Sequence, residues 1–361
     1  MSKPANKSRD AKLVDLQDRI HEAVAQGAQL IIRGNNTKAD IYPRAPAGRA
    51  RDLLLDYAGI VSYQAAELVL TVKASTQIDE IAAVLAEKKQ MLGFEPPAFG
   101  GVATIGGTVA TALSGPARPY AGSIRDAVLG VKMLTGAGDV VRFGGEVMKN
   151  VAGYDVSRLV VGSMGSLGAI LEVSLRVTPQ LPACAYWALA CDESEALQRM
   201  ASLQKRSLPI SGLAYDGEIL HLRLAGSSIA VAEAASALGD FITEDGGFWG
   251  LLNEQQLPFF TTPENLWRID LPFEPANAAA FPGTVLWDWG GRLCWLKTNE
   301  ASTAIRELVA SKHGSARLYK GRNDDAGAEA VSTPISEVRA RLRTVFDPHG
   351  VFCGAGPWIS A

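Results

Sequence analysis

The segment Phe99-Gly-Gly-Val-Ala-Thr-Ile-Gly-Gly-Thr-Val-Ala-Thr-Ala-Leu-Ser-Gly115 is the most informative part of this chain. In it, Thr104 and Ile105 lead into the glycine pair Gly106 and Gly107, and an alanine-rich segment of helical composition follows. Glycine lets a large ligand lie against the main chain, and the first turn of a helix carries partial positive charge. The stretch therefore predicts a backbone-lined site for an anionic ligand.

Two further glycine-rich turns stand at strand ends. Gly34 to Lys38 follows an apolar strand over 29–33, and its N–H groups could converge into an anion-binding nest. Gly162-Ser-Met-Gly-Ser-Leu-Gly168 enters another apolar strand over 169–177. Three such loops in one domain indicate a long diphosphate ligand that crosses several strand ends. On spacing alone, three unrelated turns remain the alternative.

On either side of these loops, the sequence predicts alternating strands and helices. The segment 11–27 has helical spacing of apolar residues, and 68–73, 77–90 and 91–94 predict a strand, a helix and a second strand in a βαβ unit. Thr76 and Asp79 resemble a capping box for that helix. Strands are also expected over 127–134 and 140–143, joined by the turn Gly136–Asp139, and the prolines of 178–182 end the domain.

A second α+β pattern follows, and then a final amphipathic helix over 334–346. Five tryptophans fall between 249 and 295, and Trp287, Trp289 and Trp295 indicate core or interface. A polar loop is expected over 323–329. Helices are expected near 193–206, 227–240 and 300–311, and strands near 185–190, 218–224, 266–271, 284–288 and 292–297.

Composition restricts the class of protein. The 361 residues are 47% apolar and 20% charged, and the net charge is −3. This balance argues against a nucleic acid or an anionic membrane bound by bulk charge. Residues 1–12 lack the apolar core of a signal peptide, and no apolar run reaches the ~18 residues of a membrane span. We therefore expect a cytoplasmic protein without a transmembrane segment.

Cysteine and histidine spacing offers no metal site and no catalytic template. No two of Cys184, Cys191, Cys294 and Cys353 form a C-x-x-C pair, so ligands for an iron–sulfur cluster or a zinc ribbon are lacking. The four histidines stand apart from one another. The sequence also lacks G-x-G-x-x-G after a strand, G-x-x-x-x-G-K-[ST], G-x-S-x-G and H-E-x-x-H. Catalytic residues therefore stay unknown at this level.

Residues 30–178 resemble the FAD-binding domain of the vanillyl-alcohol oxidase, or PCMH-type, flavoprotein superfamily. Within it, the run Arg142-Phe-Gly-Gly-Glu-Val-Met-Lys-Asn-Val-Ala-Gly-Tyr-Asp-Val-Ser-Arg158 is similar to the FAD-binding E subunits of bacterial glycolate oxidase. Phe346-Asp-Pro-His-Gly-Val-Phe352 is similar to the closing F-D-P-x-G-[IV]-F segment of that family. The matching segments of the flavin domain are 33–38, 97–107, 114–115, 122–130 and 144–168.

The resemblance implies an α+β fold: a two-subdomain PCMH-type FAD-binding domain over 1–180, then a smaller α+β, ferredoxin-like cap domain over 181–361. The cap range includes the F-D-P-x-G-V-F segment and would serve the substrate or other subunits. No histidine or cysteine occurs between His21 and Cys184, so we expect non-covalent FAD.

Cofactor-binding positions follow from the resemblance, residue by residue. Asn35 and Asn36 replace two glycines of the more usual Arg-Gly-Gly-Gly-Thr, and asparagine can adopt the same left-handed backbone. Valine at Gly106 or Gly107 is expected to empty the flavin site of a folded protein. The implied positions are Gly34, Asn35, Asn36, Thr37 and Lys38 at the pyrophosphate, Thr104, Ile105, Gly106, Gly107, Ser114 and Gly115 along the dinucleotide, Gly122 and Asp126 near the flavin, and Gly168 and Ile170 near the adenosine or flavin end.

The implied function is that of a subunit in a complex that oxidises glycolate to glyoxylate. Its partners would be a larger homologous FAD subunit that carries the substrate chemistry and an iron–sulfur subunit, with no nucleic acid involved. These partners could also place the chain at the inner face of the membrane. The histidine-rich H-x-G-D-G-N-x-H segment of D-2-hydroxy-acid dehydrogenases is missing here. A self-sufficient FAD oxidoreductase acting on another hydroxy acid, or a flavin-free scaffold, remain the alternatives.

Overall fold

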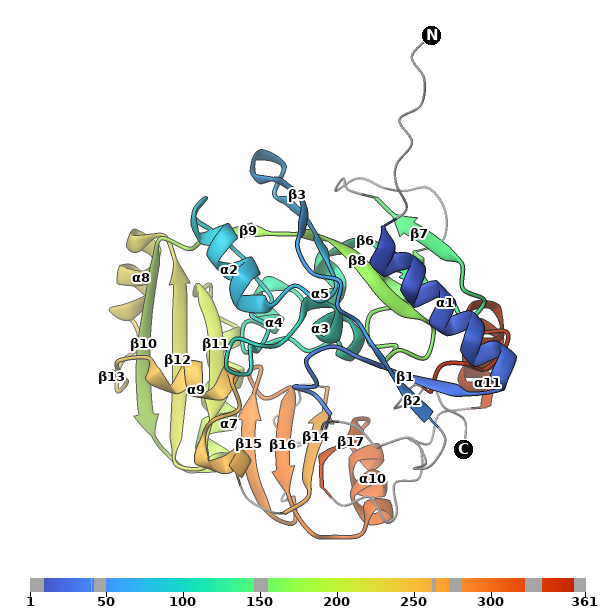
Figure 1. The fold of residues 1–361 in the computed structure, drawn as a ribbon. Coiled ribbons are helices and arrows are strands. Elements are labelled where there is room, and N and C mark those ends of the chain that lie inside the picture. Colours follow the sequence, from blue (N-terminus) through green and yellow to red (C-terminus); the bar gives the residue numbers. More distant parts are fainter. Residues whose placement is uncertain are drawn as a thin grey trace.

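The structure, a computed structural model, describes residues 10–39, 41, 50–145, 155–261, 264–272, 281–321 and 333–353. Two units share a long junction: a first unit with a five-stranded sheet and a second unit with an eight-stranded sheet. Figure 1 shows helices α3, α4 and α5 in the middle of the molecule, between the two sheets. The glycine-rich stretch that contains α3 therefore lies where the two units meet.

The first unit begins with a small parallel β-layer. Helix α1 (Ala11–Gln26) ends at Gly27, whose φ of 60° is the left-handed conformation that glycine adopts without strain. Strand β1 (Gln29–Arg33) pairs in parallel with β2 (Ala50–Leu54). The buried face of α1 packs on these strands in a separate apolar cluster. In this layer, the end of β1 leads directly into the glycine-rich loop that begins at Gly34.

The five-stranded sheet is antiparallel, in the order β3-β4-β8-β6-β7. Its central strand β8 is buried along nearly its whole length. Helices α2 (Ile78–Ala86) and α3 (Ile105–Thr111) pack their apolar residues into the same core as this sheet. The strands are β3 (Ile60–Gln64), β4 (Val69–Lys73), β6 (Val128–Leu134), β7 (Val140–Gly144) and β8 (Ala169–Arg176); the short helices are α4 (Arg118–Ala121), α5 (Ile124–Ala127) and α6 (Val156–Leu159), with a 3₁₀ turn over Ala65–Glu67.

Two local predictions in this unit were wrong. The strand after α2 is only β5 (Gln90–Met91), and it pairs with β9 (Thr178–Pro179) rather than beside β4, so no βαβ unit forms. Thr76 does not cap α2, whose N-cap is Gln77. Its hydroxyl instead donates to the Lys73 carbonyl and accepts from the Gly59 amide, because the preceding turn leaves those groups without strand partners.

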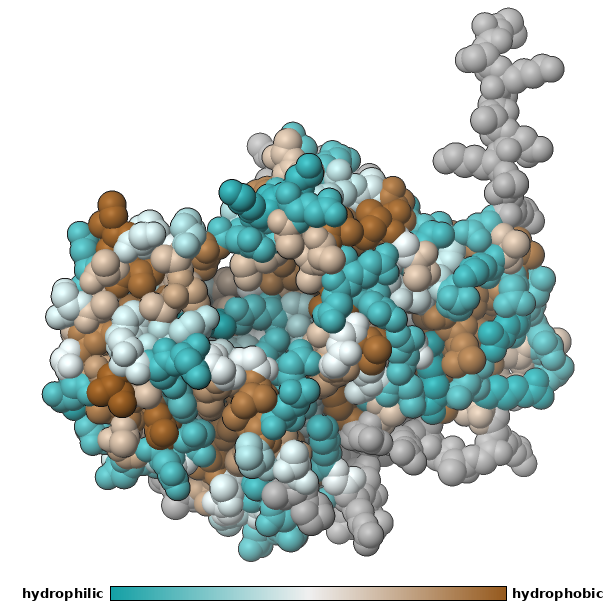
Figure 2. All heavy atoms as spheres, turned by 60° about the vertical axis from the view of Figure 1, so that its left-hand side comes forward, coloured by the Kyte–Doolittle hydropathy of each residue, from teal (hydrophilic) through white to brown (hydrophobic). Residues whose placement is uncertain are grey.

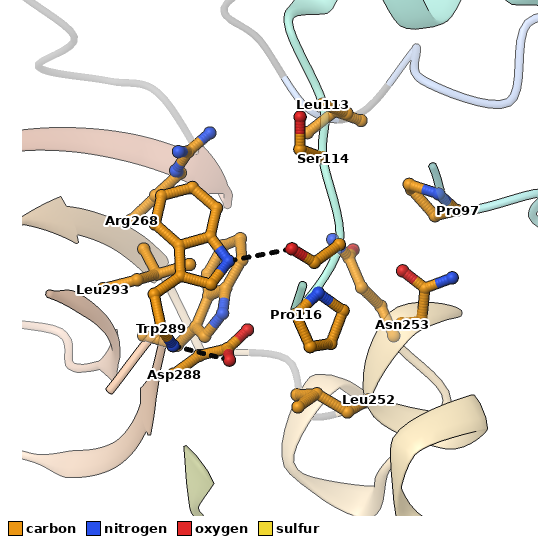
Figure 3. A pocket seen from close by; sticks show the side chains of 13 residues that line it. Pro97, Leu113, Ser114, Pro116, Leu252, Asn253, Arg268, Asp288, Trp289 and Leu293 are labelled. Carbon is orange, nitrogen blue, oxygen red and sulfur yellow. Dashed lines mark hydrogen bonds between the residues drawn. The ribbon is translucent and has the colours of Figure 1, made fainter. Parts of the chain in front are cut away.

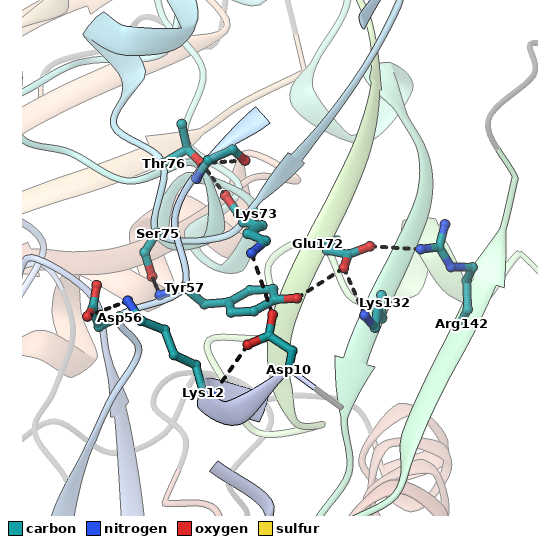
Figure 4. Close-up of polar contacts among 11 residues, drawn as sticks. Asp10, Lys12, Asp56, Tyr57, Lys73, Ser75, Thr76, Lys132, Arg142 and Glu172 are labelled. Carbon is teal, nitrogen blue, oxygen red and sulfur yellow. Dashed lines mark hydrogen bonds and ion pairs between the residues drawn. The ribbon is translucent and has the colours of Figure 1, made fainter. Parts of the chain in front are cut away.

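A buried carboxylate connects three strands of this sheet (Figure 4). Glu172 on β8 is 6% exposed and contacts Lys132 Nζ at 2.8 Å and Arg142 Nη2 at 2.7 Å. The hydroxyl of Tyr57 donates to it from the other side at 3.4 Å. A buried carboxylate is tolerated when cations and donors surround it in this way.

The second unit opens with a ferredoxin-like half, as predicted. Its order along the chain is strand, helix, two strands, helix, strand, and in the sheet the order is β13-β10-β12-β11. All neighbours in this half are antiparallel. The elements are β10 (Ala183–Ala190), α7 (Glu193–Gln204), β11 (Ile210–Tyr215), β12 (Ile219–Gly226), α8 (Ser228–Ala235) and β13 (Ile242–Thr243).

The remaining strands repeat this sheet order and extend the sheet. Their order is β15-β16-β14-β17, and β11 pairs with β15 where Tyr215 faces Trp287, so the two halves form one sheet. Helix α9 (Gly247–Asn253) and a 3₁₀ turn (Pro258–Thr261) lie between the halves in the chain. The elements are β14 (Leu266–Asp270), β15 (Thr284–Asp288), β16 (Leu293–Lys297), α10 (Ser302–Ser311) and β17 (Ser315–Lys320).

The C-terminal segment returns to the first unit. Phe346, which ends helix α11 (Thr333–Phe346), packs in the core of the five-stranded sheet, and Val351 and Phe352 pack beside α1. Phe352 also forms a parallel bridge with Leu30 of β1. Our sequence-based division grouped this segment with residues 181–361. Its side chains are apolar and match the first core, so they are buried there.

Candidate cofactor site

The first glycine-rich loop closes against the beginning of α3. A Cβ at Gly34 would lie 2.8 Å from the Thr104 hydroxyl, so this approach requires glycine. Asn36 has a φ of 59°, the left-handed conformation that the resemblance implied for the asparagines of this loop. Asn35 Nδ2 donates to the Val102 carbonyl at 2.8 Å. The loop 34–38 is thereby fixed to the segment that leads into α3.

Gly106 and Gly107 face opposite directions. The Gly106 amide donates to the Ala74 carbonyl at 2.8 Å, and a Cβ on Gly106 would lie 2.7 Å from the Ala74 Cβ. A Cβ on Gly107 would instead point to Thr104 Oγ1 at 3.2 Å and Lys38 Nζ at 3.7 Å. Gly106 is therefore required for packing against Ala74, which directly follows β4, and only Gly107 faces the first loop.

Lys38 provides the positive charge beside α3. Burial lowers its pKa from 10.5 to about 8, and the negative charge of Glu254 opposes that change. Its ammonium lies 5.3 Å from the centre of the Phe99 ring and 3.3 Å from the Thr37 hydroxyl. A partly desolvated ammonium near a helix N-terminus suits a diphosphate.

The third glycine-rich loop meets the other end of α3. The amides of Gly162 and Met164 donate to the carbonyls of Val109 and Ala110, at 3.0 and 2.9 Å. Gly162, Met164 and Gly165 all have positive φ. A Cβ on Gly165 would lie 3.3 Å from Ile32 of β1. The structure thus brings the first and third loops to opposite ends of one short helix.

Gly168 and Ile170 are placed differently from the loops. Gly168 lies against the Leu134 carbonyl, 2.6 Å from where its Cβ would be. Ile170 is 5% exposed and is paired with Met133 between β8 and β6. Both residues belong to the sheet core, so their side-chain positions offer no ligand surface.

Ser114 and Asp126 hold local structure. Ser114 Oγ accepts from the Ile124 amide at 3.2 Å. Asp126 accepts from the amide and the hydroxyl of Ser123, at 2.8 and 2.7 Å, and these bonds lower the pKa of its carboxyl. Gly122, with a φ of 90°, ends α4 just before this turn. These residues shape the segment between α3 and β6.

A small cavity marks the junction beside Gly115 (Figure 3). The Gly115 carbonyl accepts from Trp289 Nε1 at 3.0 Å, and the cavity beside it has a volume of about 30 Å³, room for about two waters. Side chains of both units line it. Asn253 Oδ1 and Gln255 Oε1, both on the lining, are buried and have no hydrogen-bond partner among the described residues.

Asp288 is the fully buried acid at this junction. Burial raises the pKa of its carboxyl to about 7, although it accepts from the Trp289 amide at 2.6 Å and Arg223 and Arg268 lie near. The guanidinium groups of Arg118 and Arg268 lie 4.3 and 5.0 Å from the Trp289 ring. Apart from the Gly290-Gly291 turn that follows Trp289, no sequence motif indicates this cluster, because its members come from four separate segments.

The arrangement fits a dinucleotide. It offers the Lys38 ammonium and a run of left-handed residues at Phe99, Gly100 and Gly101. The amides of residues 105–107 in the first turn of α3 already donate to groups of the protein, so the loop 34–38 and Lys38 are the donors that remain there. The molecular face in Figure 2 is hollowed between the bulk of the eight-stranded sheet and the first unit, and hydrophilic residues line the hollow. The similar segment 142–158 lies partly outside the described residues, since 146–154 are not among them. Within the described ranges, no cluster of metal-ligating side chains occurs, and no helix is long and apolar enough to cross a membrane.

These features define a flavoprotein of the FAD-binding type, and comparison with known proteins agrees. A family model described as "FAD binding domain" matches residues 11–144. The "Glycolate oxidase subunit GlcE" of Escherichia coli (strain K12) is 42% identical over 337 residues, covering 93% of this chain and 95% of that protein. The chain belongs to the family of this glycolate oxidase subunit, a family of FAD-dependent oxidoreductases.

More distant relatives match only part of the chain. The "Glycolate oxidase subunit GlcD" of Bacillus subtilis (strain 168) is 37% identical over 28% of this chain and 22% of that protein. A "D-2-hydroxyglutarate dehydrogenase" of Xanthomonas citri is 27% identical over 48% of this chain and 37% of that protein. A solved structure of alkyldihydroxyacetonephosphate synthase shares the fold, with a TM-score of 0.65 at 16% identity, covering 94% of this chain and 73% of that one. The predicted fold class and FAD-binding domain are thereby confirmed.

Proposed function

We propose that this chain is the FAD-binding subunit of a complex that oxidises glycolate to glyoxylate and passes the electrons to partner subunits. The observation that supports this most is the 42% identity to GlcE along 93% of the chain. The proposed partners are a homologous FAD subunit that carries the substrate chemistry and an iron–sulfur subunit. The lack of any C-x-x-C pair here is in keeping with clusters held by another chain.

In this proposal, the first loop holds the FAD diphosphate beside the N-terminus of α3. Lys38 supplies a charge, Gly107 leaves room beside it, and amides of the loop 34–38 supply further donors. Ser114 and Gly115 continue the path toward the junction, where Gly122 and Asp126 shape the adjoining turn. Bound FAD supplies a two-electron acceptor, which the protein positions.

Acid precipitation of the purified chain tests cofactor and linkage together. We expect yellow protein whose FAD appears in the supernatant after acid treatment, because no histidine or cysteine lies between His21 and Cys184 to tether it. Colour retained in the pellet would contradict non-covalent binding. Colourless protein that does not take up added FAD would favour the scaffold alternative.

The junction supports a second candidate, a self-sufficient hydroxy-acid oxidoreductase. Removal of a hydroxyl proton needs a base, and Asp288, whose pKa burial raises to about 7, is the acid held between the two units. Arg118 and Arg268 could face a substrate carboxylate. Turnover of glycolate by the isolated chain that is lost in Asp288→Asn would favour this candidate over the subunit function.

A further inference from the structure

Glu254, which follows α9, reaches from the second unit into the first. Its Oε1 accepts a hydrogen bond from the Ala98 amide at 2.7 Å, and its Oε2 accepts one from the Gly100 amide at 3.1 Å. Hydrogen bonds to an ionised carboxylate are stronger than neutral ones. One side chain of the second unit therefore holds both sides of Phe99, in the segment just before α3.

The backbone conformation of Phe99 is unfavourable unless other contacts stabilise it. Its φ of 46° lies in the left-handed region, which is unfavourable for a bulky side chain. Its ring packs against the core of the five-stranded sheet and also against the apolar cluster around Trp249 and Leu252 of α9. Lys38 Nζ lies 5.3 Å from the centre of this ring. The conformation that Glu254 holds thus sets the surface on which Lys38 rests.

Glu254 also acts on Lys38 through its charge. Burial lowers the pKa of Lys38, and Glu254 is the charged group that raises it. Among the described residues, the ammonium also lies near the Phe99 ring and the Thr37 hydroxyl, and a Cβ on Gly107 would lie 3.7 Å from it. Neither the ring nor the hydroxyl ionises near neutral pH. Glu254, a residue of the second unit, therefore acts on the loop 34–38 in two ways. Its hydrogen bonds hold the segment on which Lys38 rests, and its charge raises the pKa of Lys38.

We propose that Glu254 is a positioning residue for FAD, through which seating of the second unit on residues 98–100 and occupation of the cofactor site favour each other. This inference rests on the FAD site proposed above. Coupling of this kind is reciprocal: if the seated second unit strengthens FAD binding, FAD strengthens the seating by the same factor.

The first test compares Glu254→Ala with Glu264→Ala. Glu264 is a matched control, since it is a carboxylate of the same unit that pairs with Lys297 at 3.7 Å and does not touch the first unit in the described contacts. FAD affinity of each purified protein is measured by flavin fluorescence quenching. We expect Glu254→Ala to bind about tenfold more weakly, as the loss of charge-assisted hydrogen bonds predicts, and Glu264→Ala to bind as the wild type does.

Equal affinity in Glu254→Ala and the wild type would overturn the inference while leaving the cofactor proposal intact. Failure of the wild type to bind FAD would overturn the cofactor proposal itself. Glu254→Gln separates charge from packing. Without the carboxylate charge the pKa of Lys38 falls, so the pH above which FAD affinity declines should move below that of the wild type. An unmoved decline would contradict the action on Lys38.

A measurement on the wild type keeps the inference testable if the variants fold poorly. FAD should slow hydrogen exchange in peptides from α9 (247–253) as well as in residues 98–100, because the Glu254 contacts join them. Glu254→Ala should lose the protection of α9 at saturating FAD. Unchanged exchange of α9 in the wild type on addition of FAD would overturn the coupling.

Discussion

Gly106 and Gly107 are adjacent, yet the structure gives them different roles. The sequence predicted that both face the ligand, because a glycine pair at a helix start looks the same from either side. The peptide between them turns Gly106 onto Ala74 and Gly107 toward Lys38. Side-chain direction at such a turn depends on where β4 lies, and β4 is a tertiary neighbour that a local motif does not specify.

Gly106→Val and Gly107→Val should therefore separate stability from cofactor binding. We expect Gly106→Val to lose stability by about 1–3 kcal/mol or more through overpacking against Ala74. Gly107→Val should keep most of the melting temperature and lose FAD, because its side chain enters the space beside Lys38. Melting temperature and FAD content of both variants provide the check. Reversed effects, with Gly106→Val stable and empty, would restore the original interpretation of the pair.

The lowered pKa of Lys38 predicts two opposite pH dependences. Folding lowers this pKa from 10.5 to about 8, so the empty protein should gain stability as pH rises through that interval, where the unfolded chain still binds the proton. FAD affinity should instead fall above pH 8, because the diphosphate favours the ammonium. Lys38→Ala should weaken binding about tenfold and remove the decline, a milder loss than in Gly107→Val. A wild-type affinity that is flat to pH 10 would contradict a contact with Lys38.

At the scale of elements, periodicity predicted helices and strands better than it predicted their partners. The helices 193–206 and 334–346 appear as α7 and α11, within a few residues. The pairing of β5 with β9 was missed because two residues carry no periodic pattern. Strands β11 and β17 were missed too, although Pro209 and Gly314 stand directly before them. The local pattern of apolar residues indicates which residues are buried, but it does not indicate which strands pair with one another.

The C-terminal segment, which the resemblance includes in the range 181–361, packs in the cores of the first unit. The carboxylate of Asp347 is buried and accepts from the amides of Val351 and Phe352, at 2.8 and 2.9 Å. Gly136 donates its amide to the Phe346 carbonyl at 2.9 Å, which fixes this turn beside the β6–β7 hairpin. The motif F-D-P-x-G-V-F thus describes a turn that caps the first unit from the far end of the chain.

Asp347→Ala should accordingly destabilise the first unit. Two buried amides would lose their acceptor, at a cost of about 3 kcal/mol. Urea unfolding followed through flavin release should then show a lower midpoint for the first unit. Asp240→Ala, an exposed carboxylate of the second unit, serves as the control and should unfold as the wild type does. Equal midpoints for the two variants would show that the turn is not required.

Across the whole molecule, the fold explains why tryptophans gather between residues 249 and 295. The sequence predicts that Trp287, Trp289 and Trp295 lie in the core or at an interface. Trp249, Trp267 and Trp287 are each at most 3% exposed, and they fill the cores of the second unit and its junction. An exposed partner surface therefore cannot be inferred from them. Tryptophans are frequent here because they cover the eight-stranded sheet and fill its contact with the first unit.

The junction between the two units also bears on whether the isolated chain can oxidise glycolate. Asp288 is the candidate base that we identify among the described residues, and the cavity near it, with room for about two waters, is too small for a hydroxy acid and its approach to a flavin. Trp289 closes that space through its bond to the Gly115 carbonyl. We therefore expect the purified chain, loaded with FAD, to remain oxidised when glycolate is added anaerobically. Addition of the partner subunits should restore glycolate oxidation, with dye reduction as the measure. Rapid bleaching of the flavin by glycolate in the single-chain protein would contradict this, and loss of that bleaching in Asp288→Asn would assign the chemistry to this subunit itself.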